Sequence, residues 1–176
     1  MLDLKSMIRA IPDYPKPGIL FRDITTLIEH PQGFKESVKR LADVHRDIGI
    51  THVAGIEARG FIFGAGVAIE LGVGFIPIRK RGKLPGATIG QNYTLEYGVD
   101  TIEIHADVLT KAHKVLLIDD LIATGGTAVA AVSLMRRTGA LVENAGFVID
   151  LPDLGGAEKL RALGVKIVSL VPFGGH

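Results

Sequence analysis

Two adjacent carboxylates, Asp119 and Asp120, end an apolar run, and the segment Ala123–Thr127 follows three residues later with the sequence Ala-Thr-Gly-Gly-Thr. The glycines allow a tight turn that points several backbone N–H groups inward, and a helix beginning there would add the positive end of its dipole. Such a seat suits a phosphate, and the two threonine hydroxyls are further donors. The carboxylates accept hydrogen bonds and repel phosphate, so they suit sugar hydroxyls. Together these groups predict a site for a ribose 5-phosphate.

Aspartate followed by threonine and glycine also occurs in ordinary turns and helix caps, and for the two carboxylates alone this interpretation is equally good. The ordered combination of apolar strand, two acids and Thr-Gly-Gly-Thr favours the phosphate site. Two other phosphate motifs are excluded. Gly82-Lys83 is followed by leucine and lacks the first glycine of a Walker loop, and Gly64-Ala65-Gly66 is followed by Val-Ala-Ile, which breaks the dinucleotide fingerprint.

Five short apolar runs lack polar alternation, which predicts strands buried on both faces of a sheet. They cover residues 51–56, 74–78, 114–119, 141–150 and 166–171. Helical patterns lie between them, at residues 34–48, 61–71 and 127–138, the last followed by Gly139 as a C-terminal cap. The alternation predicts an α/β fold with a mostly parallel central sheet flanked by helices, and it places the ligand site at the carboxyl ends of the strands.

Two segments fall outside this alternation: residues 11–28, which prolines interrupt, and residues 79–98. Within the second, residues 80–91 are too rich in glycine and proline for a helix and too long for an ordinary connection, which predicts a flexible lid loop. Residues 93–97 and 101–105 predict a hairpin that turns at residues 97–100 and extends the sheet.

The bulk composition predicts one compact domain over residues 1–176, because 47% hydrophobic residues and 22 glycines are typical of an aliphatic globular chain. A net charge of +1 gives no general attraction to nucleic acid or membranes, and no apolar stretch reaches the roughly 20 residues that span a bilayer. The polar start does not read as a secretory signal, and there is no cysteine for disulfides. We therefore expect a cytoplasmic protein without nucleic-acid or membrane partners.

The stretch VLLIDDLIATGGT, within residues 115–128, resembles the motif by which type I phosphoribosyltransferases bind phosphoribosyl pyrophosphate (PRPP): apolar residues, two acids and, after a short spacer, Thr-Gly-Gly-Thr. The resemblance implies the fold of that family. It also implies that the acids bind the ribose hydroxyls and that the loop binds the 5-phosphate. The residues implied to bind PRPP and the product nucleotide are Asp119, Asp120, Ala123, Thr124, Gly125, Gly126 and Thr127.

Further stretches resemble the adenine-using members of this family: PKPGILFRDITTL (residues 15–27), the segment 55–86 with its EARG and RKRGKLPG, and YTLEYG (residues 93–98). This resemblance implies the conversion of adenine and PRPP to AMP and pyrophosphate in purine salvage. It implies Mg²⁺ as the cofactor, bound mainly through PRPP and pyrophosphate rather than by dedicated protein ligands. It also implies a homodimer.

Basic side chains on the segment 55–86 suit the leaving pyrophosphate. A guanidinium after the first buried strand can hold two phosphate oxygens at once, and four of the five residues 79–83 are basic. The alternative for the guanidinium is a surface ion pair, and the alternative for the basic cluster is a solvated face. The resemblance also implies a cis peptide bond in the loop after the first buried strand, and it implies that an arginine, Arg79, reaches the neighbouring subunit. The residues implied to bind pyrophosphate are Glu57, Ala58, Arg59, Arg79, Lys80 and Lys83, with the cis bond between Glu57 and Ala58.

The N-terminal segment, residues 1–30, is implied to form a small hood over the base. Phe21 offers a stacking face, with a place in the core as its alternative. The glutamate of YTLEYG, Glu96, is implied to relay the proton that leaves adenine when N9 bonds to ribose, helped by Tyr97. The alternative is that Glu96 is exposed to solvent and has no catalytic role. The residues implied to bind adenine are Leu20, Phe21, Arg22 and Leu121.

Two other functions remain open at this point. The first is a phosphoribosyltransferase that uses xanthine, hypoxanthine or guanine, because the choice of base depends on a few contacts. The second is a PRPP-binding regulator of transcription, which would need a DNA-binding module. No basic helix-turn-helix pattern fits before residue 51 or after residue 169.

Overall fold

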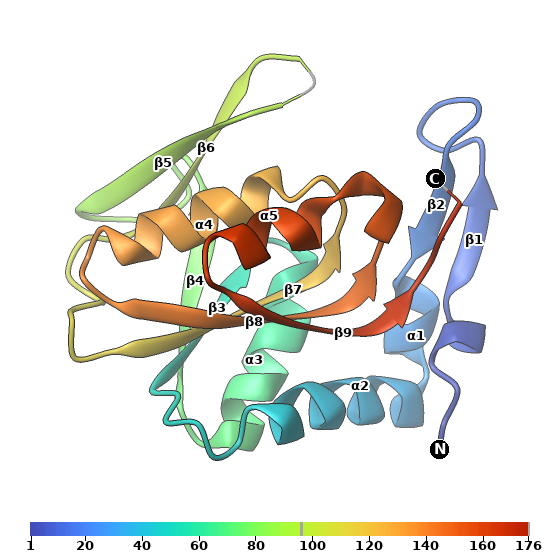
Figure 1. Ribbon diagram of the computed structural model, residues 1–176, viewed down its shortest axis with the longest axis horizontal. Helices are drawn as coiled ribbons and strands as arrows, with labels where there is room; N and C mark the ends of the chain where they lie inside the picture. Colours follow the sequence, from blue (N-terminus) through green and yellow to red (C-terminus); the bar gives the residue numbers. More distant parts are fainter. Residues whose placement is uncertain (96, 176) are drawn as a thin grey trace.

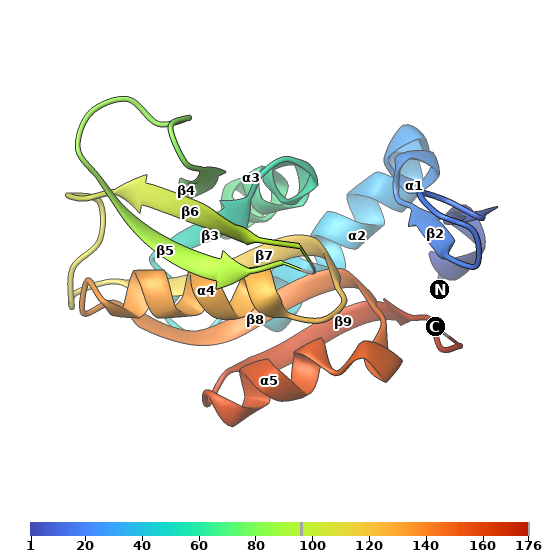
Figure 2. The same ribbon diagram turned by 90° about the horizontal axis from the view of Figure 1, so that it is seen from above.

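The computed structural model describes residues 1–95 and 97–175 and contains a seven-stranded sheet. The strand order is β5-β6-β4-β3-β7-β8-β9 (Figures 1 and 2). The neighbouring strands in the series β4-β3-β7-β8-β9 pair parallel. Strand β6 pairs antiparallel with both β4 and β5. The strands are β3 (His52–Ile56), β4 (Gly74–Lys80), β5 (Thr88–Thr94), β6 (Val99–His105), β7 (Lys114–Ile122), β8 (Leu141–Asp150) and β9 (Lys166–Pro172). The prediction of a mostly parallel sheet is confirmed.

Helices cover both faces of this sheet (Figure 2). One face packs against α2 (Pro31–Val44) and α3 (Arg59–Leu71), and the other packs against α4 (Gly126–Arg136) and α5 (Gly156–Ala162). The central strands serve both cores: on β3, Val53 belongs to the first core, whereas Ala54 and Ile56 belong to the second. Strands that bury both faces cannot carry polar alternation, which explains the continuous apolar runs of the sequence.

The helix predicted over residues 34–48 forms but lies further toward the N-terminus. It begins at Pro31, where His30 caps it by accepting a hydrogen bond from the Gly33 N–H at 3.1 Å. It ends at Val44, four residues before the predicted end, because the chain turns toward Gly49, whose φ is +79°. The helix α4 also ends sooner than predicted, at Arg136, and Gly139 takes a φ of +91° in the turn that follows.

The N-terminal segment, residues 1–30, forms a small unit that we call the hood. Its two strands, β1 (Arg9–Pro12) and β2 (Leu20–Asp23), pair antiparallel beside the carboxyl ends of β8 and β9 (Figure 1). Arg9 and Asp23 form an ion pair at 2.5 Å across the two strands, and this contact with the Thr25 hydrogen bonds lowers the pKa of Asp23 to about 2. The hood also holds a 3-10 helix, η1 (Lys5–Met7), and the short helix α1 (Thr25–Glu29), whose apolar side chains pack on α2.

The prediction of a lid loop over residues 80–91 is wrong in its extent. Strand β4 continues to Lys80 and β5 begins at Thr88, so only residues 81–87 are irregular. The glycine content led to a loop prediction that is too long, because Gly90 lies inside a strand. It belongs to β5 and pairs with Glu103 of β6, and β5 also packs against α4. The predicted hairpin exists, but Thr94 pairs with Val99, so Val99 and Asp100 belong to β6 and not to the predicted turn at residues 97–100. Within the described part of the chain, no helix has the length and apolar character needed to cross a membrane.

Candidate active site

The loop after β7 has the geometry of a phosphate seat. Gly125 takes φ +84°, and α4 begins at the next residue, so the backbone N–H groups of the first helical turn face the hollow above. A Cβ on Gly125 would lie 2.8 Å from the Cα of Gly156, so the close contact with α5 requires glycine here. The Gly156 N–H in turn donates a hydrogen bond to the Ala123 carbonyl at 3.0 Å. The hollow measures about 170 Å³ and is lined by Asp119 and residues 121–128.

The two carboxylates that precede this loop have different surroundings. Burial, followed by the neighbouring charge of Asp120, raises the pKa of Asp119 well above its ordinary value. Asp119 packs against the first turn of α3, where a Cβ on Gly60 would lie 2.6 Å from its Oδ1. Asp120 is 6% exposed and its Oδ2 lies 2.6 Å from the Nε of Arg59, which also belongs to the first turn of α3. The sheet therefore brings the acids of β7 and the arginine after β3 together.

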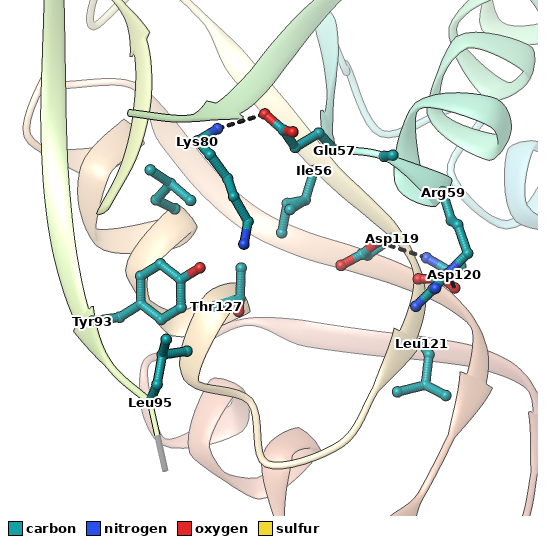
Figure 3. Close-up of a pocket in the computed structure, with 12 residues that line it drawn as sticks. Ile56, Glu57, Arg59, Lys80, Tyr93, Leu95, Asp119, Asp120, Leu121 and Thr127 are labelled. Atoms are coloured by element: carbon teal, nitrogen blue, oxygen red, sulfur yellow. Dashed lines mark hydrogen bonds and ion pairs between the residues drawn. The ribbon is translucent and has the colours of Figure 1, made fainter. Parts of the chain in front are cut away.

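A cavity of about 390 Å³ opens at the carboxyl ends of β3, β4 and β7 (Figure 3). Parallel strands place their carboxyl ends at one edge of the sheet, which is where the sequence predicts a ligand site. The two acids predicted to bind the sugar, a threonine of the loop after β7 and four of the predicted pyrophosphate residues meet in this space. The lining residues are Ile56, Glu57, Ala58, Arg59, Lys80, Tyr93, Leu95, Ile102, Asp119, Asp120, Leu121 and Thr127.

The loop after β3 forms one wall of this cavity, and the peptide bond between Glu57 and Ala58 is cis, as predicted. Glu57 accepts a hydrogen bond from the Lys80 N–H at 2.6 Å and forms an ion pair with Arg79 at 3.3 Å. Two of the predicted pyrophosphate residues, Arg79 and Lys83, do not line the cavity. The Arg79 guanidinium lies against the ring of Phe61 at 6.0 Å and donates to the Lys83 carbonyl.

Two site residues were missed by sequence reasoning. Tyr93 and Asp100 lie opposite each other on β5 and β6, and the Tyr93 hydroxyl donates to Asp100 Oδ2 at 3.2 Å. The same oxygen lies 3.0 Å from the Lys80 ammonium, which points into the cavity toward Thr127 together with Tyr93 (Figure 3). Asp100 raises the pKa of Lys80, and burial raises the pKa of Tyr93. Cross-strand pairing in the hairpin was the available signal, but the predicted turn at residues 97–100 placed Asp100 outside both strands.

A second, larger cavity of about 550 Å³ lies between the hood and the carboxyl ends of the strands. Leu121 and Arg59 line both cavities, so the two spaces adjoin. The ring of Phe21 is half-buried, faces this cavity and meets Tyr14 edge to face, which speaks against a place in the core. All four residues implied to bind adenine line this space, together with six others. The lining residues are Gly18, Ile19, Leu20, Phe21, Arg22, Arg59, Leu121, Leu151, Leu154 and Gly175.

The implied catalytic residue, Glu96, lies outside the described residues. Among the described residues beside it, the Leu95 N–H donates a hydrogen bond to the Gly98 carbonyl at 2.9 Å, and Leu95 lines the first cavity. Tyr97 is 77% exposed.

Comparisons with known proteins identify relatives of the chain. A profile of the phosphoribosyl transferase domain matches residues 23–159. The chain is 59% identical to the adenine phosphoribosyltransferase of Parvibaculum lavamentivorans, covering 99% of this chain and 100% of that protein. The crystal structure of adenine phosphoribosyltransferase from Thermoanaerobacter pseudethanolicus superimposes with a TM-score of 0.91 at 45% identity, covering 97% and 98% of the two chains. The enzyme from Trypanosoma brucei, in complex with AMP, pyrophosphate and ribose-5-phosphate, gives 0.88 at 29% identity, covering 96% and 78%.

The chain therefore belongs to the phosphoribosyltransferase family, which its fold and the loop after β7 also indicate. Its matches over the full length place it, within that family, among the adenine phosphoribosyltransferases.

Proposed function

We propose that the chain transfers the phosphoribosyl group of PRPP to adenine and releases pyrophosphate and AMP. The observation that carries this proposal is the continuity of three spaces: the phosphate seat, the cavity with the cations and carboxylates, and the hood cavity. Leu121 lines all three. A ligand with a phosphate at one end, a sugar in the middle and a planar base at the other would fill them in that order.

The phosphate seat, residues 123–127, would bind the 5-phosphate, and Asp119 and Asp120 would bind the ribose hydroxyls. Asp120 is paired with Arg59, so binding of the sugar would free the guanidinium for the pyrophosphate. Lys80 and the backbone of Glu57 and Ala58 would contact the same group. Positive side chains stabilise the negative charge of a departing pyrophosphate most strongly in a space shielded from water.

Mg²⁺ prefers oxygen ligands, and the carboxylates of Asp120 and Glu57 offer oxygens of this kind in the first cavity. Both carboxylates already form ion pairs, with Arg59 and Arg79, so Mg²⁺ would take most of its ligands from the substrate. Among the described residues, no group of three or more His, Cys, Asp or Glu side chains could hold a metal ion. We therefore place Mg²⁺ on the oxygens of PRPP and pyrophosphate, where it would neutralise the leaving group.

The reaction would be a displacement at ribose C1 through an oxocarbenium-like state, with adenine N9 as the nucleophile. The base would lie between Phe21 and Leu121, with the backbone of Leu20 and Phe21 along its edge and Arg22 fixing the hood. We assign Glu96 as the residue that takes the adenine proton, with Tyr97 beside it. The variant Glu96→Gln should lose at least about a hundredfold in kcat, because general base catalysis contributes about that much or more. Full turnover by this variant would refute the assignment.

Two features of the proposal concern assembly and closure. The irregular residues 81–87, with Lys83, would close over the site as a shortened lid.

We also propose a homodimer in which Arg79 reaches the neighbouring site. Ile62 and Ile69 on α3 support an interface, because they are 39% and 81% exposed on the helix that follows the Glu57–Ala58 loop. Light scattering after size exclusion tests the assembly, and a single-chain mass would refute it.

The decisive experiment measures product formation from PRPP and Mg²⁺ with radiolabelled adenine, hypoxanthine, guanine, xanthine and orotate in parallel. Dominant turnover of adenine supports the proposal. Turnover of another base instead would keep the PRPP site and overturn the assignment of the hood cavity. Failure with all five bases, together with tight binding of PRPP and DNA, would favour a regulator.

A further inference from the structure

The segment Phe173–Gly175, which we call the tail strap, forms one side of the hood cavity. It follows β9 directly, and the Phe173 N–H donates a hydrogen bond to the Asp150 carbonyl at 2.9 Å. Phe173 is 6% exposed, and Gly175 lines the hood cavity together with Leu20, Phe21 and Arg22 of β2. Figure 1 shows this end of the described chain beside β2. The strap therefore connects the sheet to the hood at the base site.

Three side chains contact the strap: Asp153, Arg22 and Lys5, whose ammonium lies 4.9 Å from the centroid of the Phe173 ring. Asp153, in the 3-10 helix η2 (Pro152–Leu154) after β8, accepts a hydrogen bond from the Gly175 N–H at 2.6 Å through its Oδ2. The guanidinium carbon of Arg22 lies 4.1 Å from the centroid of the Phe173 ring, which is a cation–π geometry. The Arg22 Nε is buried and has no hydrogen-bond partner in residues 1–95 and 97–175, so the ring is its main support on that side.

We propose that Asp153 is a positioning residue for the base: it holds the tail strap, and the strap holds Arg22 and β2 against the hood cavity. This inference rests on the proposed function, because it takes the hood cavity as the site of the base. The rest of the hood packs through Leu4, Ile8 and Leu27 into the core around α2, to which Phe173 also belongs. No residue of α2 lines the hood cavity, so the strap links this core to the part of the hood that would face adenine.

The position of Asp153 separates its effect on the base from any effect on PRPP. It lines neither the phosphate seat nor the first cavity, whereas its neighbours Leu151 and Leu154 line the hood cavity. Loss of its hydrogen bond should therefore loosen adenine binding alone. The variant Asp153→Ala should raise the KM for adenine about five- to tenfold, the effect of one lost hydrogen bond, while the KM for PRPP changes less than about twofold.

Three further variants sharpen the test. Asp153→Asn keeps an oxygen acceptor and should restore most of the adenine KM. Phe173→Leu keeps the apolar volume but removes the ring, and it should raise the same KM. Asp107→Ala, an equal change on an exposed carboxylate beyond β6, should leave both KM values unchanged. The midpoint of thermal unfolding is measured for all four variants to separate positioning from loss of stability.

The outcomes distinguish this inference from the proposed function. An adenine KM that stays unchanged in Asp153→Ala, or a KM for PRPP that rises equally, overturns the positioning role. A wild-type protein that makes no AMP overturns the proposed function itself, before any variant is compared.

Discussion

The contact between the phosphate seat and α5 leads to a quantitative prediction for Gly125→Ala. The substitution forces a residue with a side chain into φ +84°, which costs about 1–2 kcal/mol. Its Cβ would also lie 2.8 Å from the Gly156 Cα and 3.0 Å from the Gly156 carbonyl oxygen. Both are backbone atoms, so the loop must move, and overpacking of this kind costs about 1–3 kcal/mol. We expect the free energy of unfolding to fall by about 2–5 kcal/mol.

The matched control is Gly49→Ala. Gly49 has nearly the same φ, +79°, but no atom lies within 4 Å of an added Cβ, and it is far from the site in the loop after α2. This variant should therefore lose only the conformational part, about 1–2 kcal/mol. Urea unfolding of both variants isolates the contribution of the contact, and initial rates at varied PRPP report the position of the loop. Gly125→Ala should raise the KM for PRPP at least tenfold, whereas Gly49→Ala should not change it.

Equal stability of the two variants would refute the steric argument. An unchanged KM for PRPP in Gly125→Ala, in folded protein, would refute the assignment of this loop as the phosphate seat.

Three further predictions concern charged groups. Asp100→Asn should raise the KM for PRPP several-fold in steady-state assays, because Lys80 loses the carboxylate that holds it in the cavity; an unchanged KM would show that Lys80 needs no such support. Asp119→Asn should abolish most turnover yet make the protein more stable than wild type at pH 8. The raised pKa means that the native state binds more protons than the unfolded state, so wild-type stability falls as the pH rises above about 4, and the advantage of the variant in urea unfolding should shrink toward that pH. Asp23→Asn has the opposite sign: it should be less stable than wild type at pH 7, and the difference should vanish as the pH falls from about 4 to about 2. Parallel pH profiles of wild type and variant would contradict either argument.

The sequence by itself determined the elements whose causes are local. The continuous apolar runs predicted the five strands β3, β4, β7, β8 and β9. Of these, β3, β7 and β8 are mostly buried, whereas β4 is mostly half-buried or exposed and β9 lies half-buried at the edge of the sheet. The order of two acids and Thr-Gly-Gly-Thr gave the phosphate seat, because a helix N-terminus after a glycine turn needs no distant partner to point its N–H groups outward. The resemblance added the cis bond at Glu57–Ala58, which the structure confirms.

The tertiary structure decided which side chains pair across the site. Arg59 and Asp120 are 61 residues apart in the chain, yet their contact is 2.6 Å long. The alignment of Tyr93 with Asp100 depended on where the hairpin turns, and a shift of the turn changes every cross-strand pair. The tail strap has no recognisable sequence motif. Phe173 contacts Arg22, and Asp153 lies close to the strap, only because β8 and β9 end beside the hood. Local pattern fixes conformation over a few residues, whereas the partners of a side chain are set by how distant strands are brought to one edge of the sheet.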